Sequence, residues 1–247
     1  MDVTQSIDGQ AAILTGASAG IGEATAHALA REGADVALAA RRRERLEALA
    51  DTLATEYDAE AVVVPTDVRD EDDVDALVET AVDAFGGLDV LVNNAGLARG
   101  GSIEDMTTEE YRTMMDTNVD GMFFAARAAL PHLRESAGTL VFVGSFAGEY
   151  PRPGNPVYAA SKWWTRGFAK SLSARIGDDD VAVSVVNPAE VRTEFGDAYG
   201  EPYAERYDAG EVSEPEEVAE AVVFAATQSP SMAAEIDVYR RDKFTGF

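Results

Sequence analysis

The chain has 247 residues, no cysteine, and 45 acidic against 20 basic side chains, for a formal net charge of −25. The lack of cysteine excludes disulfides and thiol catalysis and favours a cytoplasmic location. A surface this negative repels phosphate, which argues against nucleic acid and anionic membranes as partners, and we expect neither a signal peptide nor a membrane span.

Short apolar runs alternate with helical patterns along the whole chain. They predict strands at 11–15, 35–40, 61–65, 89–93, 139–144 and 181–187. This spacing requires right-handed crossovers and a parallel sheet that is covered on both faces. We therefore expect an α/β fold, with one doubly wound Rossmann-type domain spanning residues 1–247.

Helices are predicted between the strands where apolar residues recur every three or four positions, as at Leu46, Leu49 and Leu53. The acidic run at 70–73 lies where one such helix should begin. Carboxylates are favoured at the positive end of a helix dipole. We interpret this run as a solvated helix start and expect no metal site.

The first predicted strand leads into the segment "TGASAGIG", in which Gly16, Gly20 and Gly22 precede the helix expected at 21–31. Glycines at such a turn let backbone amides approach a pyrophosphate, and the helix N-terminus then faces the negative charge. A plain strand-to-helix turn is the alternative. The position after the first strand favours dinucleotide binding.

The second predicted strand ends near Ala40, where an NAD site usually carries an acidic residue for the ribose 2′-hydroxyl. Here Arg41, Arg42 and Arg43 follow instead. Guanidinium groups can bind a 2′-phosphate through paired hydrogen bonds. A solvated helix start is the alternative, but cations oppose the dipole at a helix N-terminus. We expect NADP, with NAD as the disfavoured choice.

Lysine occurs only three times in the chain, and one of these residues, Lys162, stands four positions after Tyr158. Residues four apart share one face of a helix. An unperturbed phenol titrates near pH 10, and a nearby ammonium lowers that value toward the range of a useful acid or base. An exposed tyrosine with an incidental lysine is the alternative.

Six motifs occur in order: "TGASAGIG", "NNAG" (93–96), "NVDG" (118–121), Ser145, "YAASK" (158–162) and "NPAEVRTEF" (187–195). As an ordered set they closely resemble the short-chain dehydrogenase/reductase family across nearly the whole chain. The segments "NNAGLARG", "GSFAGEYPRPGNPVYAASK" and "AAEIDVYRRDKF" look like the NADP-dependent 3-hydroxy acid dehydrogenases, which act on serine and similar small hydroxy acids.

The resemblance implies a catalytic set of four residues. Tyr158 would exchange the proton on the substrate oxygen, and Ser145 would donate a hydrogen bond to that oxygen. Lys162 would bind the nicotinamide ribose, and Asn118 would hold a water that relays protons to solvent. No metal is required, and the scattered histidines match no catalytic position.

The resemblance also implies the cofactor contacts. Besides the glycines, Arg41, Arg42 and the catalytic pair, the expected cofactor-binding residues are Ser18, Ile21, Asp67, Val68, Asn94, Ala95, Gly96, Pro188, Val191 and Thr193. Asp67 and Val68 should contact adenine, and Thr193 the carboxamide and phosphates. Ala189 departs from the family, which usually has glycine there, so the geometry of the nicotinamide loop is open.

The segment at about 190–212 should form a substrate lid. Its Tyr199, Tyr203 and Tyr207 recur every four residues and predict one aromatic helical face, which would close over substrate or pack on a partner subunit. Arg152 and Arg206 would pair with a substrate carboxylate or offset local acid.

The leading hypothesis is an NADP-dependent enzyme that transfers hydride between nicotinamide and a small, 3-hydroxy acid-like substrate. The alternatives are an NAD-preferring or sugar/alcohol dehydrogenase of the same family, and a non-catalytic NADP-sensing protein. Surplus apolar residues on the helices expected at 107–135 and 155–177 predict a homotetramer or homodimer. They are Met122, Phe123, Phe124, Trp163, Trp164 and Phe168.

The acidic excess and scarcity of lysine are typical of halophilic proteins, in which dense salt screens self-repulsion. An ordinary acidic cytosolic protein is the alternative.

Overall fold

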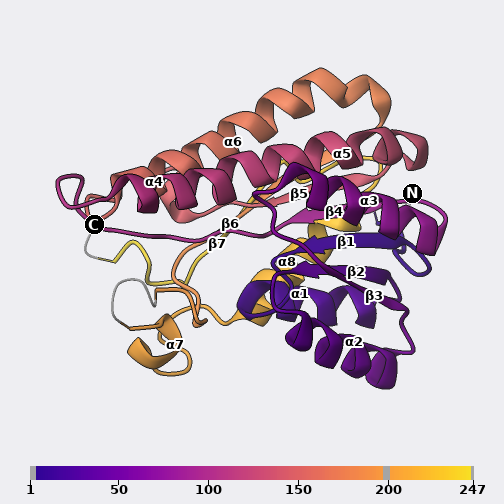
Figure 1. Ribbon diagram of the computed structural model, residues 1–247, viewed down its shortest axis with the longest axis horizontal. Coiled ribbons are helices and arrows are strands. Elements are labelled where there is room, and N and C mark those ends of the chain that lie inside the picture. Colours follow the sequence, from indigo (N-terminus) through magenta and orange to yellow (C-terminus); the bar gives the residue numbers. More distant parts are fainter. Residues whose placement is uncertain (1–3, 197–200, 246–247) are drawn as a thin grey trace.

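The computed structural model describes residues 4–196 and 201–245. Within these residues, seven strands form one parallel sheet in the order β3-β2-β1-β4-β5-β6-β7 (Figure 1). The strands are β1 Ala11–Thr15, β2 Asp35–Ala40, β3 Ala61–Pro65, β4 Val90–Asn93, β5 Thr139–Val143, β6 Ala182–Pro188 and β7 Glu235–Val238. The expected parallel, doubly wound sheet is confirmed. The order reverses between β1 and β4, which is where such folds bind ligands.

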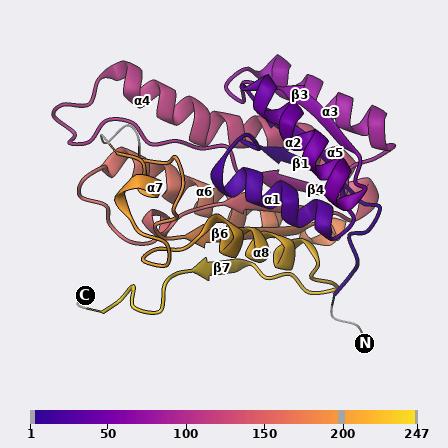
Figure 2. The ribbon, with the colours of Figure 1, turned by 90° about the horizontal axis from the view of Figure 1, so that it is seen from below.

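Helices cover both faces of this sheet (Figures 1 and 2). They are α1 Gly20–Arg31, α2 Arg43–Tyr57, α3 Glu71–Phe85, α4 Thr108–Met115, α5 Gly121–Ser136, α6 Pro156–Ile176, α7 Tyr203–Arg206 and α8 Pro215–Ala226, with 3₁₀ turns at Phe146–Gly148 and Gly177–Asp179. The core has two layers: α1, α2 and α8 pack on one face, and α3, α5 and α6 on the other.

The side chains of β1 alternate between the two core layers. Ala12 and Leu14 pack in the layer with α1 and α8, whereas Ile13 packs in the opposite layer. Successive side chains of a strand point to opposite faces. Because both faces are covered, β1 is buried at every position and reads as a continuous apolar run.

The six predicted strands are confirmed to within one residue at each end. The seventh, β7 Glu235–Val238, was not predicted. It is only four residues long and carries two acids, Glu235 and Asp237. Both find partners: Glu235 pairs with Arg166 and Lys170, and Asp237 accepts a hydrogen bond from Asn187.

The acidic run at 70–73 begins α3, as expected. The Asp70 side chain caps the helix by accepting a hydrogen bond from the Asp72 N–H, and Glu71, Asp72 and Asp73 fill the first turn. Gly86, at φ 80°, ends the helix in the left-handed conformation that glycine adopts readily.

The helix expected at 107–135 is interrupted. Between α4 and α5, residues Asp116–Asp120 form one π-helical turn, and Asn118 is completely buried there. Single π turns inside α-helices are frequent at functional sites.

The prediction of one helical face of tyrosines in the lid segment is wrong for the two tyrosines that the structure describes there, Tyr203 and Tyr207. Helix α7 spans only Tyr203–Arg206, and Tyr207 has extended backbone angles. The Tyr203 and Tyr207 rings still meet edge to face, with centroids 5.6 Å apart. Tyr199 lies outside the described residues.

The apolar surplus on α5 and α6 is smaller than expected. Met122 belongs to the core, because only 2% of its surface is exposed, and Trp164 stacks on Phe168. Phe123 and Trp163 are the large apolar side chains that these two helices leave exposed within the described residues.

Candidate active site

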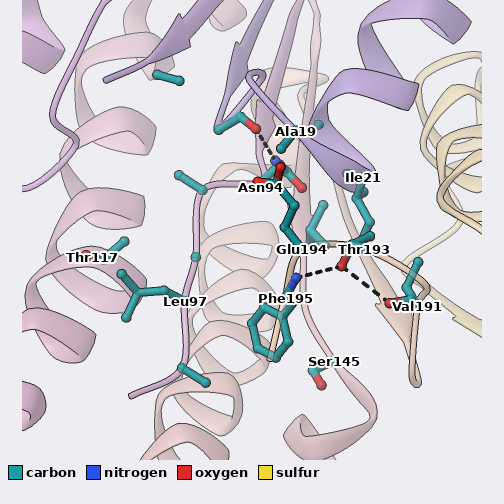
Figure 3. A pocket seen from close by; sticks show the side chains of 18 of the residues that line it. Ala19, Ile21, Asn94, Leu97, Thr117, Ser145, Val191, Thr193, Glu194 and Phe195 are labelled. Carbon is teal, nitrogen blue, oxygen red and sulfur yellow. Dashed lines mark hydrogen bonds between the residues drawn. The ribbon is translucent and has the colours of Figure 1, made fainter. Parts of the chain in front are cut away.

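A cavity of about 370 Å³ lies beside the glycine-rich turn that follows β1 (Figure 3). Its walls come from the segments after β1, β2, β3, β4, β5 and β6, so it occupies the edge formed by the carboxyl ends of the strands. All the predicted cofactor-binding residues line it: Gly16, Ser18, Gly20, Ile21, Gly22, Arg41, Arg42, Asp67, Val68, Asn94, Ala95, Gly96, Tyr158, Lys162, Pro188, Val191 and Thr193.

The glycines of the turn are required by its backbone. Gly16 has φ +70°, and a Cβ on it would lie 2.9 Å from Ala95 Cα. A Cβ on Gly22 would lie 2.1 Å from the carbonyl oxygen of Gly16. The bare backbone and the N-terminus of α1 therefore form a concave wall that suits a pyrophosphate.

Asn94 holds this turn in place. Its Nδ2 donates to the carbonyl oxygens of Thr15 (2.9 Å) and Gly16 (3.2 Å), and its backbone N–H donates to Thr15 Oγ1 (3.0 Å). Both amide hydrogens are thus engaged within the protein. A direct contact of Asn94 with cofactor stays a prediction, and the structure adds a structural role.

The end of the cavity beside β2 is positively charged. Arg42 donates to both the hydroxyl and the carbonyl oxygen of Ser18, so its guanidinium lies against the glycine turn. Ala40 ends the strand, and Arg41 lines the cavity next to it.

Asp67 and Val68 form the neighbouring wall after β3. The Asp67 carboxylate accepts hydrogen bonds from the Arg69 guanidinium, which holds its pKa below the usual range. Val68 is buried and packs in the core. An adenine contact by either residue stays a prediction.

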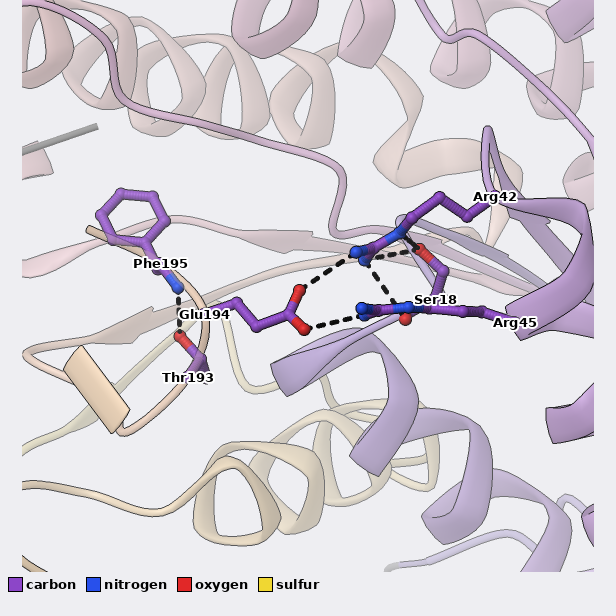
Figure 4. A network of polar contacts seen from close by, with 6 residues as sticks. All are labelled: Ser18, Arg42, Arg45, Thr193, Glu194 and Phe195. Atoms are coloured by element: carbon purple, nitrogen blue, oxygen red, sulfur yellow. Dashed lines mark hydrogen bonds and ion pairs between the residues drawn. The ribbon is translucent and has the colours of Figure 1, made fainter. Parts of the chain in front are cut away.

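A carboxylate from the segment expected to form the lid reaches the arginines at this end of the cavity. Glu194 accepts hydrogen bonds from Arg42 Nη1 (3.1 Å) and Arg45 Nη1 (2.8 Å) (Figure 4). The Arg45 hydrogen bond, with help from Arg42, lowers the Glu194 pKa. Sequence reasoning assigned no role to Glu194, although it lies in the motif at 187–195, or to Arg45, because their contact joins segments 149 positions apart.

The opposite end of the cavity brings together Ser145, Tyr158 and Lys162. Ser145 follows β5 and caps a 3₁₀ turn by accepting from the Ala147 N–H. Tyr158 lies in the first turn of α6, where the Asn155 side chain caps the helix through the Tyr158 N–H. All three reactive side chains are at least nine-tenths buried, so their polar atoms act in a poorly hydrated space.

Lys162 lies one turn beyond Tyr158, with Nζ 6.0 Å from the centre of the Tyr158 ring. Its Nζ donates to the carbonyl oxygen of Val143 at 2.9 Å. Burial lowers the Lys162 pKa to about 8. The amine therefore remains mostly protonated at neutral pH, as the expected role beside a phenol requires.

Asn118 lies behind the cavity wall and does not line the cavity. Its side chain is hydrogen bonded to the backbone of Leu97 and to Ser161. A Cβ added to Gly96 would lie 3.4 Å from Asn118 Oδ1 and 3.5 Å from Lys162 Nζ. Gly96 thus lies between Asn118 Oδ1 and Lys162 Nζ. The expected water relay between these two side chains stays a prediction.

The loop after β6, which is expected to contact nicotinamide, accommodates Ala189 without a positive φ. The Ala189 N–H donates to the Val238 carbonyl at 3.2 Å. Thr193 packs against the glycine turn: a Cβ on Gly20 would lie 2.9 Å from its methyl carbon. Thr193 Oγ1 also accepts from the Phe195 N–H (Figure 3).

The segment expected to form a lid contributes Phe195 and Tyr203 to the cavity near Tyr158. Arg152 also lines this end: its guanidinium carbon is 5.6 Å from the Tyr158 ring centre, and Nη2 donates to Tyr203 Oη at 2.7 Å. Arg206 does not line the cavity and lies over the Tyr207 ring.

Over residues 4–196 and 201–245, no group of three or more acidic or histidine side chains is arranged to hold a metal ion. None of the helices in that part of the chain has the length and apolar character needed to cross a membrane. His27 pairs with Tyr57, at 3.3 Å between Nδ1 and the hydroxyl, away from the cavity.

Known proteins resemble this chain closely. The family model for short chain dehydrogenase matches residues 10–204. The chain belongs to the short-chain dehydrogenase family. An uncharacterized oxidoreductase of Staphylococcus aureus is 36% identical over 218 residues, which cover 88% of this chain and 90% of the relative.

Solved structures agree with this membership. An alcohol dehydrogenase from Thermococcus sibiricus, complexed with 5-hydroxy-NADP, is 30% identical, with a TM-score of 0.85 over 93% of this chain and 96% of its own. A 3-ketoacyl-(acyl-carrier-protein) reductase from Brucella melitensis, complexed with NADH, is 29% identical, with a TM-score of 0.84 over 95% and 98%. The expected enzyme class, an NAD(P)-dependent dehydrogenase/reductase, is confirmed.

Proposed function

We propose that this short-chain dehydrogenase uses NADP to interconvert a small 3-hydroxy acid-like substrate and its carbonyl form, with Tyr158 as general acid and base. The main support for this proposal is a single cavity with two different ends. The glycine turn and Arg42 line one end, and Ser145, Tyr158 and Lys162 line the other. A dinucleotide bound along it would have phosphates at the first end and a reactive ring at the second.

The residues present fit this cofactor. The glycine turn leaves room for a pyrophosphate at the N-terminus of α1, and Arg41 and Arg42 offer guanidinium groups for a 2′-phosphate. Replacing Arg41 and Arg42 with alanine should weaken NADP binding far more than NAD binding, by about 1.5–3 kcal/mol for each lost contact. Equal weakening of both cofactors would favour the NAD-preferring alternative.

Bound nicotinamide would supply or accept the hydride. The protein does the rest with three side chains at one end of the cavity. Ser145 Oγ donates a hydrogen bond where negative charge develops on the substrate oxygen. Tyr158 Oη gives or takes the proton of that oxygen, and the buried charge of Lys162 favours the phenolate form.

Arg152 supports a substrate that carries a carboxylate. Its guanidinium lies over the Tyr158 ring, and the hydrogen bond to Tyr203 Oη holds it there. Guanidinium–carboxylate pairing is strong and directional in a partly buried site. The carboxylate of a 3-hydroxy acid would then anchor the molecule with its hydroxyl near Tyr158. The segment at about 190–212, which supplies Phe195 and Tyr203, would close over it as a lid.

A substrate panel tests the reaction. Purified enzyme in molar potassium chloride is offered 3-hydroxy acids, neutral alcohols of equal size and sugars, each with NADP and NAD, and nicotinamide absorbance is followed. We expect turnover of hydroxy acids with NADP. Arg152→Ala should raise KM for the acids and leave KM for the neutral alcohols unchanged. Turnover confined to sugars or neutral alcohols would contradict the substrate assignment, and no turnover with any would favour a sensor.

We also propose that the enzyme is a homo-oligomer, a tetramer or a dimer, adapted to high salt. The exposed Phe123 and Trp163 on neighbouring helices support an apolar contact between copies. The net charge of −25 supports the adaptation to salt.

A further inference from the structure

The Glu194 carboxylate lies between two arginines of a different segment (Figure 4). Arg42 is the residue before α2 and Arg45 lies in its first turn, whereas Glu194 follows Thr193 in the lid. The two ion pairs, at 3.1 and 2.8 Å, thus tie the start of the lid to the start of α2.

This pair of guanidinium groups forms an anion site. Both lie at a helix N-terminus, whose dipole already favours negative charge, and the Arg42 guanidinium is fixed against the glycine turn by Ser18. About half of each side chain is exposed, so a ligand can reach it. The position after β2 is the one at which a cofactor 2′-phosphate is expected.

We propose that Glu194 is a specificity-determining residue: its carboxylate occupies the 2′-phosphate site, and NADP binds only when Glu194 leaves. NAD, which lacks that phosphate, binds with both ion pairs intact. This inference rests on the cofactor site proposed above. A phosphate monoester carries more charge than a carboxylate and more acceptor oxygens, so it displaces Glu194 at a cost.

That cost is small because the ion pairs are exposed. Exposed pairs of this kind contribute little each, and two of them correspond to about a three- to tenfold change in affinity. Glu194 therefore weakens NADP binding without preventing it.

The test is the affinity of the free protein for cofactor. Glu194→Gln keeps the size of the side chain and removes its charge. Isothermal titration at one fixed salt concentration should show NADP binding about three- to tenfold tighter than in wild type, and NAD binding changed less than about twofold. The variant should also bind adenosine 2′-monophosphate more tightly than wild type does. Its affinity for adenosine 5′-monophosphate should be unchanged.

Two matched variants separate the local effect from the loss of one negative charge. Glu47 is as exposed as Glu194 and pairs with Arg43 on the outer side of the same helix, so Glu47→Gln should leave both affinities unchanged. Combining Glu194→Gln with Arg45→Ala should abolish part of the gain, because one of the released guanidinium groups is gone.

Unchanged or weaker NADP binding in Glu194→Gln would overturn the inference, as would equal tightening of NADP and NAD. The NADP preference proposed above is tested by a different result, the two affinities of the wild type. If wild type binds NAD as tightly as NADP, the proposed preference is wrong, yet a gain for NADP alone in Glu194→Gln would still support Glu194 as the competitor.

Discussion

The side chain of Asn118 forms a closed pair of hydrogen bonds with the backbone of Leu97: Nδ2 donates to the Leu97 carbonyl at 2.8 Å, and Oδ1 accepts from the Leu97 N–H at 2.9 Å. A third bond runs from Nδ2 to Ser161 Oγ at 3.1 Å. Asn118 therefore joins the loop after β4 to α6, one residue before Lys162.

Replacing Asn118 with alanine should reduce activity strongly and lower the free energy of unfolding by about 1–3 kcal/mol, because buried backbone groups lose their partners. Asn93 provides a control: it is equally buried, and its Nδ2 donates to the Met122 carbonyl at 3.2 Å. Asn93→Ala should cost similar stability, measured by urea unfolding, and retain most of kcat. Equal loss of kcat in both variants would make Asn118 merely structural.

Tyr158→Phe removes one oxygen at the reactive end of the cavity. We expect kcat to fall by about 10²–10⁴-fold, which is the usual contribution of a positioned acid or base. NADP affinity, measured by titration of the free protein, should change little. Tyr203→Phe, in the same cavity, should retain kcat to within about tenfold; wild-type rates in Tyr158→Phe would refute the mechanism.

The buried charge of Lys162 should lower the free energy of unfolding, although the proposed reaction needs it. Its pKa is lowered by burial to about 8, so the folded state binds fewer protons than the unfolded state between about pH 8 and 10.5. The cost of burying the charge is therefore fully present at pH 7 and is lost as the pH rises. We expect Lys162→Met to be inactive, yet more stable than wild type by about 1–3 kcal/mol at pH 7.

Urea unfolding of both proteins at pH 7 and pH 10 checks this sign. The advantage of Lys162→Met should shrink to under about 1 kcal/mol at pH 10, where the lysine is largely neutral. Lys170→Met is the control, because more than half of the Lys170 side chain is exposed. An advantage independent of pH would show that packing, not charge, is responsible.

The sequence predicted those parts of the molecule that local chemistry decides. Six strands follow from apolar runs, because a sheet covered on both faces buries every position of a strand. The cavity residues were predicted from the ordered motifs that resemble the short-chain dehydrogenase/reductase family, and the topology brings these motifs to one edge of the sheet.

The remainder depends on contacts between distant segments. Strand β7 was missed because its acids are stabilised by Arg166 and Asn187, which its own sequence does not reveal. Asn118, in the π turn, hydrogen bonds to the Leu97 backbone, which is 21 positions away in the sequence. Glu194 reaches Arg42 from 152 positions away, and no short motif encodes that approach.

The exposed faces of α5 and α6 should join copies of the chain. Light scattering in molar salt is expected to show a tetramer or dimer, and Trp163→Glu should dissociate it, because half of the ring is exposed in the single chain and a buried carboxylate is costly. Ile103→Glu, at an exposed apolar side chain in the loop between β4 and α4, should not. A monomer in wild type would refute the assembly.

Salt should stabilise both fold and assembly. Charges repel across roughly 30 Å at 0.01 M ionic strength but only roughly 3 Å at 1 M. With −25 charges per chain, activity and melting temperature should rise from dilute buffer to molar potassium chloride. A neutral osmolyte of equal osmotic strength should rescue less than salt. A melting temperature that does not change with salt would identify the acidity as incidental.

The family model stops at residue 204, but the loop that carries Pro188, Val191 and Thr193 is anchored by residues beyond it. Val238 accepts from the Ala189 N–H, Lys243 pairs with Glu190 at 2.6 Å, and the Arg192 guanidinium pairs with Glu214. Residues 214–243 thus hold one wall of the cavity in place. For laboratory work, a purification tag belongs at the N-terminus, and a version shortened to the family boundary is expected to lose the contacts that fix this loop.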